Sequence, residues 1–460
     1  MDVRDVLCCA GISFLAVVGD LGAKACTTVA VGARASATGF VMVGHTEDFD
    51  RSRMDHAFVP ARDWPAGALL PPDRSCARIP QVPRTYGFYW SSAVTRRGVC
   101  PCCDSALNEK GVFVTMNYGG KSRIGSADPG GASDGDVRNR AVEGAGAAGD
   151  GVRDQVLRCV AERAADAHGG MQVVTNLLSR YGMTGGGWIW VIADRREAWI
   201  VQGVNGRHFV ANRVADDEVA VVPNVLTVRE PSADTVCSPG LADEAVRRGW
   251  SRPGEPFDFS RAYQGEDWFM HPHSVSRFRQ AAEILTGRPW THDVTFSVRP
   301  RRRVSARTVK TILSSHVVEG PDAHADEAGP ICRTETGEAS VCVFGGSPLD
   351  TVLDVAFGRP CLYPWIRLRP LAEPLPDSLA VSDAARRFDE QFERKPAAPL
   401  PTDHAWRRLV TAVERISAFA QDRQAVWRRV KQAVEDGEAT TIDEALAAAE
   451  GFVAAAGKCE

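Results

Sequence analysis

The first candidate for chemistry is Cys26, because of the residues on either side of it. Ala23-Lys24-Ala25 directly precedes it and has the pattern that signal peptidases cleave. Cleavage after Ala25 would make Cys26 the first residue and free its α-amine, whose pKa is about 8. Such an amine can take the proton of the thiol and later return it to a leaving amine. A lone cysteine is more often structural, but this position predicts an N-terminal nucleophile.

The residues before Cys26 have the features of a leader. Residues 6–19 form an apolar run that is shorter than the about 20 residues of a membrane-spanning helix, and it fits the core of a signal peptide. Its early region has one base, Arg4, opposed by two acids, so a propeptide stays an alternative. We predict that residues 1–25 are a signal peptide or propeptide, with no stable membrane span after processing. A signal peptide implies a secreted, endomembrane or lysosome-like location, and a propeptide a cytoplasmic one.

A hairpin is predicted directly after the leader. Residues 26–32 alternate with a period of two, residues 40–44 form a second strand, and a small, polar connection ending in glycine joins them. A connection centred between positions 35 and 36 places Cys26 opposite His45. The thiol then lies near two carboxylates, Glu47 and Asp48.

The hairpin sequence resembles the start of a known family. CTTVAVG from Cys26 and the later GHTEDFD are similar to the opening of the dipeptidase A family of N-terminal-nucleophile cysteine peptidases, which is related to the choloylglycine hydrolases and penicillin V acylases. Further similar segments follow in order at 111–117, 181–224, 257–260, 274–277, 295–300 and 330–333. The resemblance implies an α+β fold, the four-layer αββα sandwich, over residues 26–370. It also implies hydrolysis of dipeptides through a thioester, without metal or organic cofactor.

The resemblance also suggests roles for single residues. It makes Cys26 the nucleophile and Asp48 the acid that holds its amine. Asn117 and Asn224 match residues near the scissile bond, where amide donors can stabilise an oxyanion by about 3 kcal/mol each. Arg277 matches a late arginine of the related acylases. Asn224 could also be an ordinary turn residue, Asn117 could cap a loop, and Arg277 could pair with surface carboxylates.

His45 departs from the family, which usually has arginine at this position. Because histidine ordinarily titrates near neutrality, thiolate stabilisation is expected to depend on pH. His45 and Glu47 are therefore possible contacts of the thiolate or the substrate. Two alternatives to a dipeptidase stay open: an N-acyl amide hydrolase of the same fold, and a catalytically impaired secreted binding protein.

Other patterns predict the surrounding elements. Residues 107–118 read as a turn and a strand, residues 121–151 as a long mobile loop, and residues 371–460 as a helical extension with a capping box at Thr441 and Glu444. Further strands are expected at 188–193, 198–204, 208–212 and 219–223. Helices are expected at 154–181, divided at Gly169-Gly170, and at 274–285 and 309–316.

Composition limits the partners. The chain has 460 residues and a formal net charge of −4, which does not favour nucleic acid as a partner, so small peptides are the expected substrates. Its 13 cysteines include a dense group, CPCC at 100–103, without the second half of a zinc motif, so no metal site is expected. Disulfides are possible if the chain is secreted, and a homo-oligomer stays possible.

Overall fold

The computed structural model describes most of the chain after the predicted leader. The leader, residues 1–25, and residues 125–150 of the predicted mobile loop lie outside the described residues. These are 26–48, 53–70, 77–95, 98–99, 104–124, 151–153, 155–183, 186–318, 323–325, 329–377, 379, 404–436 and 441–456.

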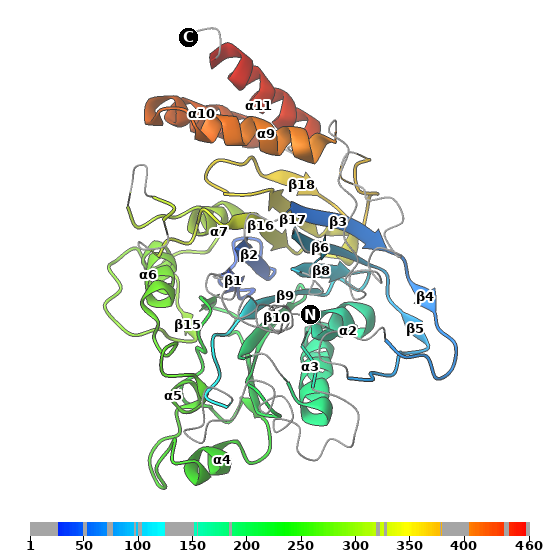
Figure 1. Ribbon diagram of the computed structural model, residues 1–460, viewed down its shortest axis with the longest axis vertical. Helices are drawn as coiled ribbons and strands as arrows, with labels where there is room; N and C mark the ends of the chain where they lie inside the picture. The colour runs from blue at the N-terminus through cyan, green and yellow to red at the C-terminus, as the bar shows by residue number, and fades with distance from the viewer. Residues whose placement is uncertain are drawn as a thin grey trace, which may run out of the picture.

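Two large antiparallel sheets form the body of the molecule (Figure 1). The seven-stranded sheet carries the predicted hairpin in its interior, as β1 and β2. Its order is β15 (Ser297–Val298), β13 (Val219–Val222), β1 (Thr27–Val31), β2 (Met42–Asp48), β16 (Thr336–Val343), β17 (Val352–Ala356) and β18 (Ile366–Leu368).

The nine-stranded sheet contains the predicted strands other than the hairpin and β13. Its path is β14 (Val236–Cys237), β12 (Phe209–Arg213), β11 (Ala198–Gly203), β10 (Trp188–Ala193), β9 (Phe113–Tyr118), β8 (Ser105–Asn108), β6 (Phe88–Thr95) and β3 (Arg53–Val59), and β7 (Gly98–Val99) pairs with β6. A small separate ribbon joins β4 (Arg62–Asp63) to β5 (Arg84–Thr85).

Strand β10 shows where the core lies. Ile189 and Val191 join a core cluster shared with residues of the seven-stranded sheet, such as Val29. Trp190 and Ile192 point to the opposite face and pack in a second cluster with helices. Because side chains alternate along a strand, both faces of β10 are covered, which explains its continuous apolar sequence.

Helices pack on both sheets. Helices α2 (Gln155–Arg163) and α3 (Ala167–Tyr181) contact strands of the nine-stranded sheet, whereas α6 (Pro272–Thr286) and α7 (Ala306–Leu313) contact strands of the other sheet (Figure 1). Two short helices, α4 (Leu241–Arg247) and α5 (Phe259–Tyr263), lie in the long connection after β14. A 3-10 turn, η2, spans Pro348–Asp350. No helix in the described ranges is long and apolar enough to cross a bilayer.

The register of the hairpin differs from the prediction. His45 pairs with Thr28 rather than with Cys26, so the connection is centred one residue later than expected. The connection contains more contacts than a simple turn, including a bridge between Ser36 and Val304. Since the partner moves by two residues, each side chain keeps its predicted face. Cys26 therefore meets Glu47.

The helix break is also placed differently. The predicted helical region divides at residues 164–166, and Gly169-Gly170 lies within α3. Asp166 begins α3 as its N-cap, since its carboxylate accepts a hydrogen bond from the amide of Gly169 at 2.7 Å. Gly170 allows close packing on β10, because a Cβ there would lie 2.6 Å from Cγ2 of Ile192. The expected helix at 309–316 ends at Leu313, so His316 lies beyond it.

Three helices follow at the C-terminal end and cover the β17–β18 side of the sheet (Figure 1). They are α9 (Ala405–Ser417), α10 (Gln421–Glu435) and α11 (Ile442–Ala456). The indole of Trp427 is buried and donates a hydrogen bond to the carbonyl of Leu362 at 2.9 Å. The capping box predicted at Thr441 and Glu444 is present. Residues of this extension pack in the same core cluster as residues of the sheets. The boundary between a catalytic domain ending at residue 370 and a C-terminal extension stays a prediction.

Candidate active site

Cys26 lies directly before β1, in a buried and acidic environment. It is 4% exposed, and its thiol donates a hydrogen bond to Oε2 of Glu47 at 3.3 Å. Burial, together with the carboxylates of Glu47 and Asp48, raises the pKa of the thiol well above its usual value, although the backbone amide of Asp48 opposes this. The Cys26 thiol is therefore harder to deprotonate than an exposed cysteine.

Arg277 of α6 connects Cys26 to a second predicted site residue. Its Nη1 donates to the carbonyl oxygen of Cys26 at 2.8 Å and to Oδ1 of Asn224 at 2.8 Å. Its Nη2 donates to the carbonyl of Pro223 at 2.8 Å. Burial lowers the pKa of Arg277 to about 9, so it remains a cation at neutral pH. The helix therefore carries a buried positive charge to the start of β1.

Asn224 stands just after β13 with an unusual backbone. Its φ is 65°, in the left-handed region that asparagine tolerates better than most residues. Its Nδ2 donates to the carbonyl of Tyr118 at 2.7 Å. Since an amide nitrogen carries two hydrogens, one N–H remains for another acceptor.

Asn117 of β9 reaches the same region from the other sheet. Its Oδ1 accepts a hydrogen bond from the hydroxyl of Thr28 at 2.6 Å. Asn117 is fully buried. The two asparagines therefore come to the site from different sheets.

His45 forms a buried charge network with two carboxylates. Its Nε2 lies 2.8 Å from Oδ1 of Asp104 and 3.7 Å from Oε2 of Glu47. Its Nδ1 lies 2.7 Å from the Thr28 hydroxyl. That hydroxyl gives its hydrogen to Asn117, so it can only accept from the ring. Both ring nitrogens thus act as donors, and His45 is an imidazolium.

Electrostatics lead to the same charge. Burial disfavours the imidazolium, but Asp104 and Glu47 outweigh this and raise the pKa of His45 to about 10. The expectation that His45 titrates near neutrality was therefore wrong. The two buried carboxylates keep the His45 ring cationic at neutral pH.

Asp48, at the end of β2, is fully buried. Its Oδ1 accepts from the hydroxyl of Thr336 at 2.7 Å, whereas its Oδ2 has no hydrogen-bond partner among the described residues. Burial raises the pKa of Asp48 to about 6, although Arg333 and Arg277 oppose the rise. A buried carboxylate oxygen is therefore available for a cation beside Cys26.

The seven predicted residues are brought together, but their immediate partners were not all foreseen. Asp104, Arg333 and Thr28 were missed as parts of the site. Asp104 comes directly before β8 and follows the cysteine group, which drew attention only as a metal candidate. Arg333 lies in a segment that carries the resemblance. Strand β8, which follows Asp104, was not predicted, because residues 107–118 were interpreted as a turn and one strand, so no local pattern marked this carboxylate.

Three site residues also have side chains of the kinds that bind metal ions. A sulfur, a ring nitrogen and a carboxylate oxygen of Cys26, His45 and Glu47 all lie within 4.8 Å of one another. Both ring nitrogens of His45 already have hydrogen-bonding partners, the Thr28 hydroxyl and the Asp104 carboxylate. The geometry fits a charge network around the thiol better than a bound ion.

Comparison with known proteins identifies the family. Residues 25–336 match the sequence model of Peptidase family C69, and this region is more than half of the chain. The chain belongs to peptidase family C69. The matched family region contains all seven predicted site residues, and it ends at the first residue of β16.

The relatives that the chain matches share little sequence identity with it. The chain is 24% identical to "Probable dipeptidase A" of Streptococcus pyogenes serotype M1 over 325 residues, 67% of this chain and 64% of that protein. It is 22% identical to "Dipeptidase A" of Lactobacillus helveticus over 328 residues, 66% of this chain and 64% of that protein. The chain thus spans slightly less than two thirds of these relatives. Among solved structures, penicillin V acylase from Agrobacterium tumefaciens is similar with a TM-score of 0.36 at 12% identity, covering 75% of this chain and 86% of that chain.

Proposed function

We propose that the mature chain, beginning at Cys26, is a cysteine dipeptidase that hydrolyses small peptides through a thioester. The observation that carries the proposal is the buried network in which Arg277 holds both the Cys26 carbonyl and Asn224. Membership of peptidase family C69 supports it.

The first step requires a base, which we assign to the α-amine of Cys26. The amine takes the thiol proton, the sulfur attacks the peptide carbonyl carbon, and a tetrahedral intermediate forms. The resulting ammonium then gives its proton to the leaving amine, and water later hydrolyses the thioester. The unpartnered Oδ2 of Asp48 suits this ammonium, and the imidazolium of His45, within 4.8 Å of the sulfur, stabilises the thiolate.

The oxyanion needs neutral donors already in place. We assign this role to the side-chain amides of Asn117 and Asn224, each worth about 3 kcal/mol in the transition state. Both are fully buried, and their oxygens are held by Thr28 and Arg277. Holding the oxygens orients the N–H groups before the substrate arrives.

A dipeptide also carries a free α-ammonium. Glu47 is the carboxylate that we assign to it, because its side chain is 15% exposed while Asp48 is fully buried. Glu47 also contacts the thiol, so it stands where the first substrate residue would lie.

We propose the four-layer αββα sandwich as the fold. The shared core between the sheets and the helices on both of them support this arrangement.

The proposal is tested with mature protein that begins at Cys26. Dipeptides with a free α-amine are expected to be cleaved at least roughly tenfold faster than their N-acetylated forms, because acetylation leaves Glu47 without its partner. Released amino acids are measured by mass spectrometry. Glu47→Gln should reduce this preference. Faster cleavage of the N-acyl substrates would favour an acylase, and no cleavage by folded mature protein would favour a binding protein.

Removal of the Asp104 carboxylate should make activity sensitive to alkaline pH. In the wild type, the His45 cation persists until pH approaches about 10. In Asp104→Asn, the pKa of His45 falls, so the cation is lost as pH rises through a lower value. We expect kcat/KM for a dipeptide to fall by roughly ten- to a hundredfold at pH 8 and by less at pH 6.

The control for this prediction is Asp63→Asn, which removes one carboxylate from the exposed β4–β5 ribbon. It should leave the pH profile unchanged. Dividing the activity of Asp104→Asn by that of the wild type at each pH removes the effect of groups that titrate in both proteins. A ratio that stays constant from pH 6 to pH 9 would show that Asp104 does not maintain the charge of His45.

A further inference from the structure

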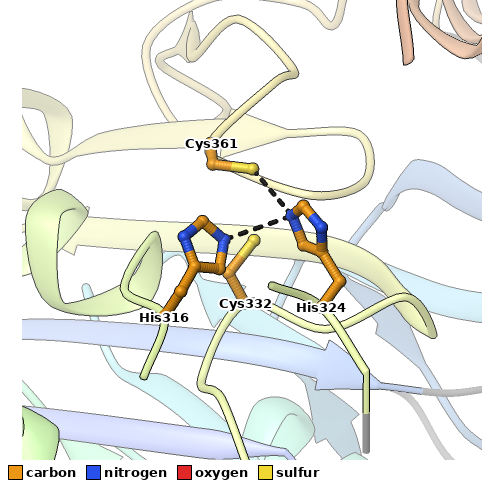
Figure 2. Close-up of side chains that lie close together, drawn as sticks. All are labelled: His316, His324, Cys332 and Cys361. Carbon is orange, nitrogen blue, oxygen red and sulfur yellow. Dashed lines mark hydrogen bonds between the residues drawn. The ribbon is translucent and has the colours of Figure 1, made fainter. Parts of the chain in front are cut away.

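A second cluster of reactive side chains lies outside the candidate active site. It consists of His316, His324, Cys332 and Cys361, whose side chains point toward one another in Figure 2. They come from four places: the segment after α7, residues 323–325, the segment before β16, and the β17–β18 connection. We propose that this His2Cys2 cluster is a structural zinc site.

The geometry is close to that of a tetrahedral site. One ligand atom from each residue lies within 4.8 Å of the other three. Nε2 of His324 is 3.1 Å from Nε2 of His316 and 3.1 Å from Sγ of Cys361. Zinc ligands at bond lengths of about 2.0–2.3 Å are roughly 3.3–3.8 Å apart in a tetrahedron. The two 3.1 Å pairs would therefore open slightly, and any wider pair, which is at most 4.8 Å apart, would close by about 1 Å.

The ligand types select the metal. Two sulfurs and two imidazoles in tetrahedral positions suit zinc, while magnesium and calcium prefer oxygen ligands. Four protein ligands also complete the coordination, as in structural sites, and leave no position for a catalytic water. Cys332 is fully buried and the other three are partly buried, so an ion could enter from the surface.

A disulfide between Cys332 and Cys361 is the main competing explanation. Both cysteines are free in the structure. A disulfide would use the two sulfurs but would give no role to the two imidazoles that converge on them. The metal accounts for all four side chains.

The proposed ion would also brace the active site. The amide of Cys332 donates to the carbonyl of Ser315 at 3.1 Å, and that of Thr334 donates to the carbonyl of His324 at 3.1 Å. Two residues further, Thr336 supports the Asp48 carboxylate. Zinc would hold this segment in place, so its ligands are positioning residues with respect to the reaction.

The test is the metal content of the full chain, purified without chelators. We expect one zinc per chain in the wild type and in Cys26→Ala, which removes the thiol of the other cluster. Cys332→Ser combined with Cys361→Ser should lose the zinc. Wild type without zinc, a Cys332–Cys361 disulfide found by non-reducing peptide mapping, or equal zinc in the double variant would each overturn the proposal.

A second measurement covers the case in which the double variant does not fold. Wild-type zinc is removed with a chelator and replaced with Co²⁺. Tetrahedral cobalt with two thiolates should give intense thiolate charge-transfer absorption, and the unfolding midpoint should fall by several degrees on metal removal and recover on adding Zn²⁺. Cobalt absorption without thiolate bands, or an unchanged midpoint, would overturn the assignment. These readouts do not depend on dipeptidase activity.

Discussion

Replacement of Cys26 with alanine is expected to lower kcat/KM for dipeptides by at least about 10⁴-fold while the fold remains intact. In the proposed mechanism, the thiol supplies the sulfur that forms the thioester. The Cys26 side chain donates a hydrogen bond to Glu47 at 3.3 Å, and loss of this bond should change the free energy of unfolding by no more than about 1–2 kcal/mol. Dipeptide turnover and thermal unfolding of the purified variant measure the two effects.

Cys342→Ala is the matched control. Cys342 is also a fully buried free cysteine, on β16 opposite Val43 of β2. Its replacement should cost stability by a similar amount but keep kcat/KM within about twofold. If Cys26→Ala turns over dipeptides at the wild-type rate, Cys26 is not the nucleophile.

A chain that still carries residues 1–25 is expected to have no dipeptidase activity, even with Cys26 present. In that chain the nitrogen of Cys26 is an amide whose lone pair is delocalised into the carbonyl of Ala25, so it cannot act as a base near neutral pH. The thiol itself is a poor nucleophile there, because burial and two carboxylates raise its pKa. In the proposed mechanism, removal of the leader creates both the base and the ammonium that suits Asp48.

Two routes of removal can be separated by intact mass. Wild type and Cys26→Ala are produced in a secreting host and in a cytosolic one, and the activity of each species is measured. Self-cleavage by the thiol would leave the leader on Cys26→Ala in both hosts. A signal peptidase reads Ala23 and Ala25, so it would remove the leader from both proteins in the secreting host. Full activity from a species of uncleaved mass would refute the amine mechanism.

The sequence alone determined the features that depend on near neighbours. The β1–β2 hairpin, the strands β10 to β13, and the capping box at Thr441 all follow from periodicity and turn chemistry within a few residues. The choice of Cys26 depended on the residues directly beside it. The hairpin register was two residues off, because contacts such as that of Ser36 with Val304 alter the connection. The face of each strand was still predicted, since a period of two is insensitive to that shift.

Only the tertiary structure decided the charges and the second cluster. Asp104 lies 59 positions from His45 in the chain, yet it determines whether the ring is a cation. Similarly, Cys361 lies 37 positions from His324 and contacts it only because β17 and β18 bring their connection beside the segment before β16. Burial and through-space electrostatics depend on which distant segments the sheets place together. Local sequence patterns contain no record of those distances, so the cation at His45 and the His2Cys2 cluster could be found only in the folded chain.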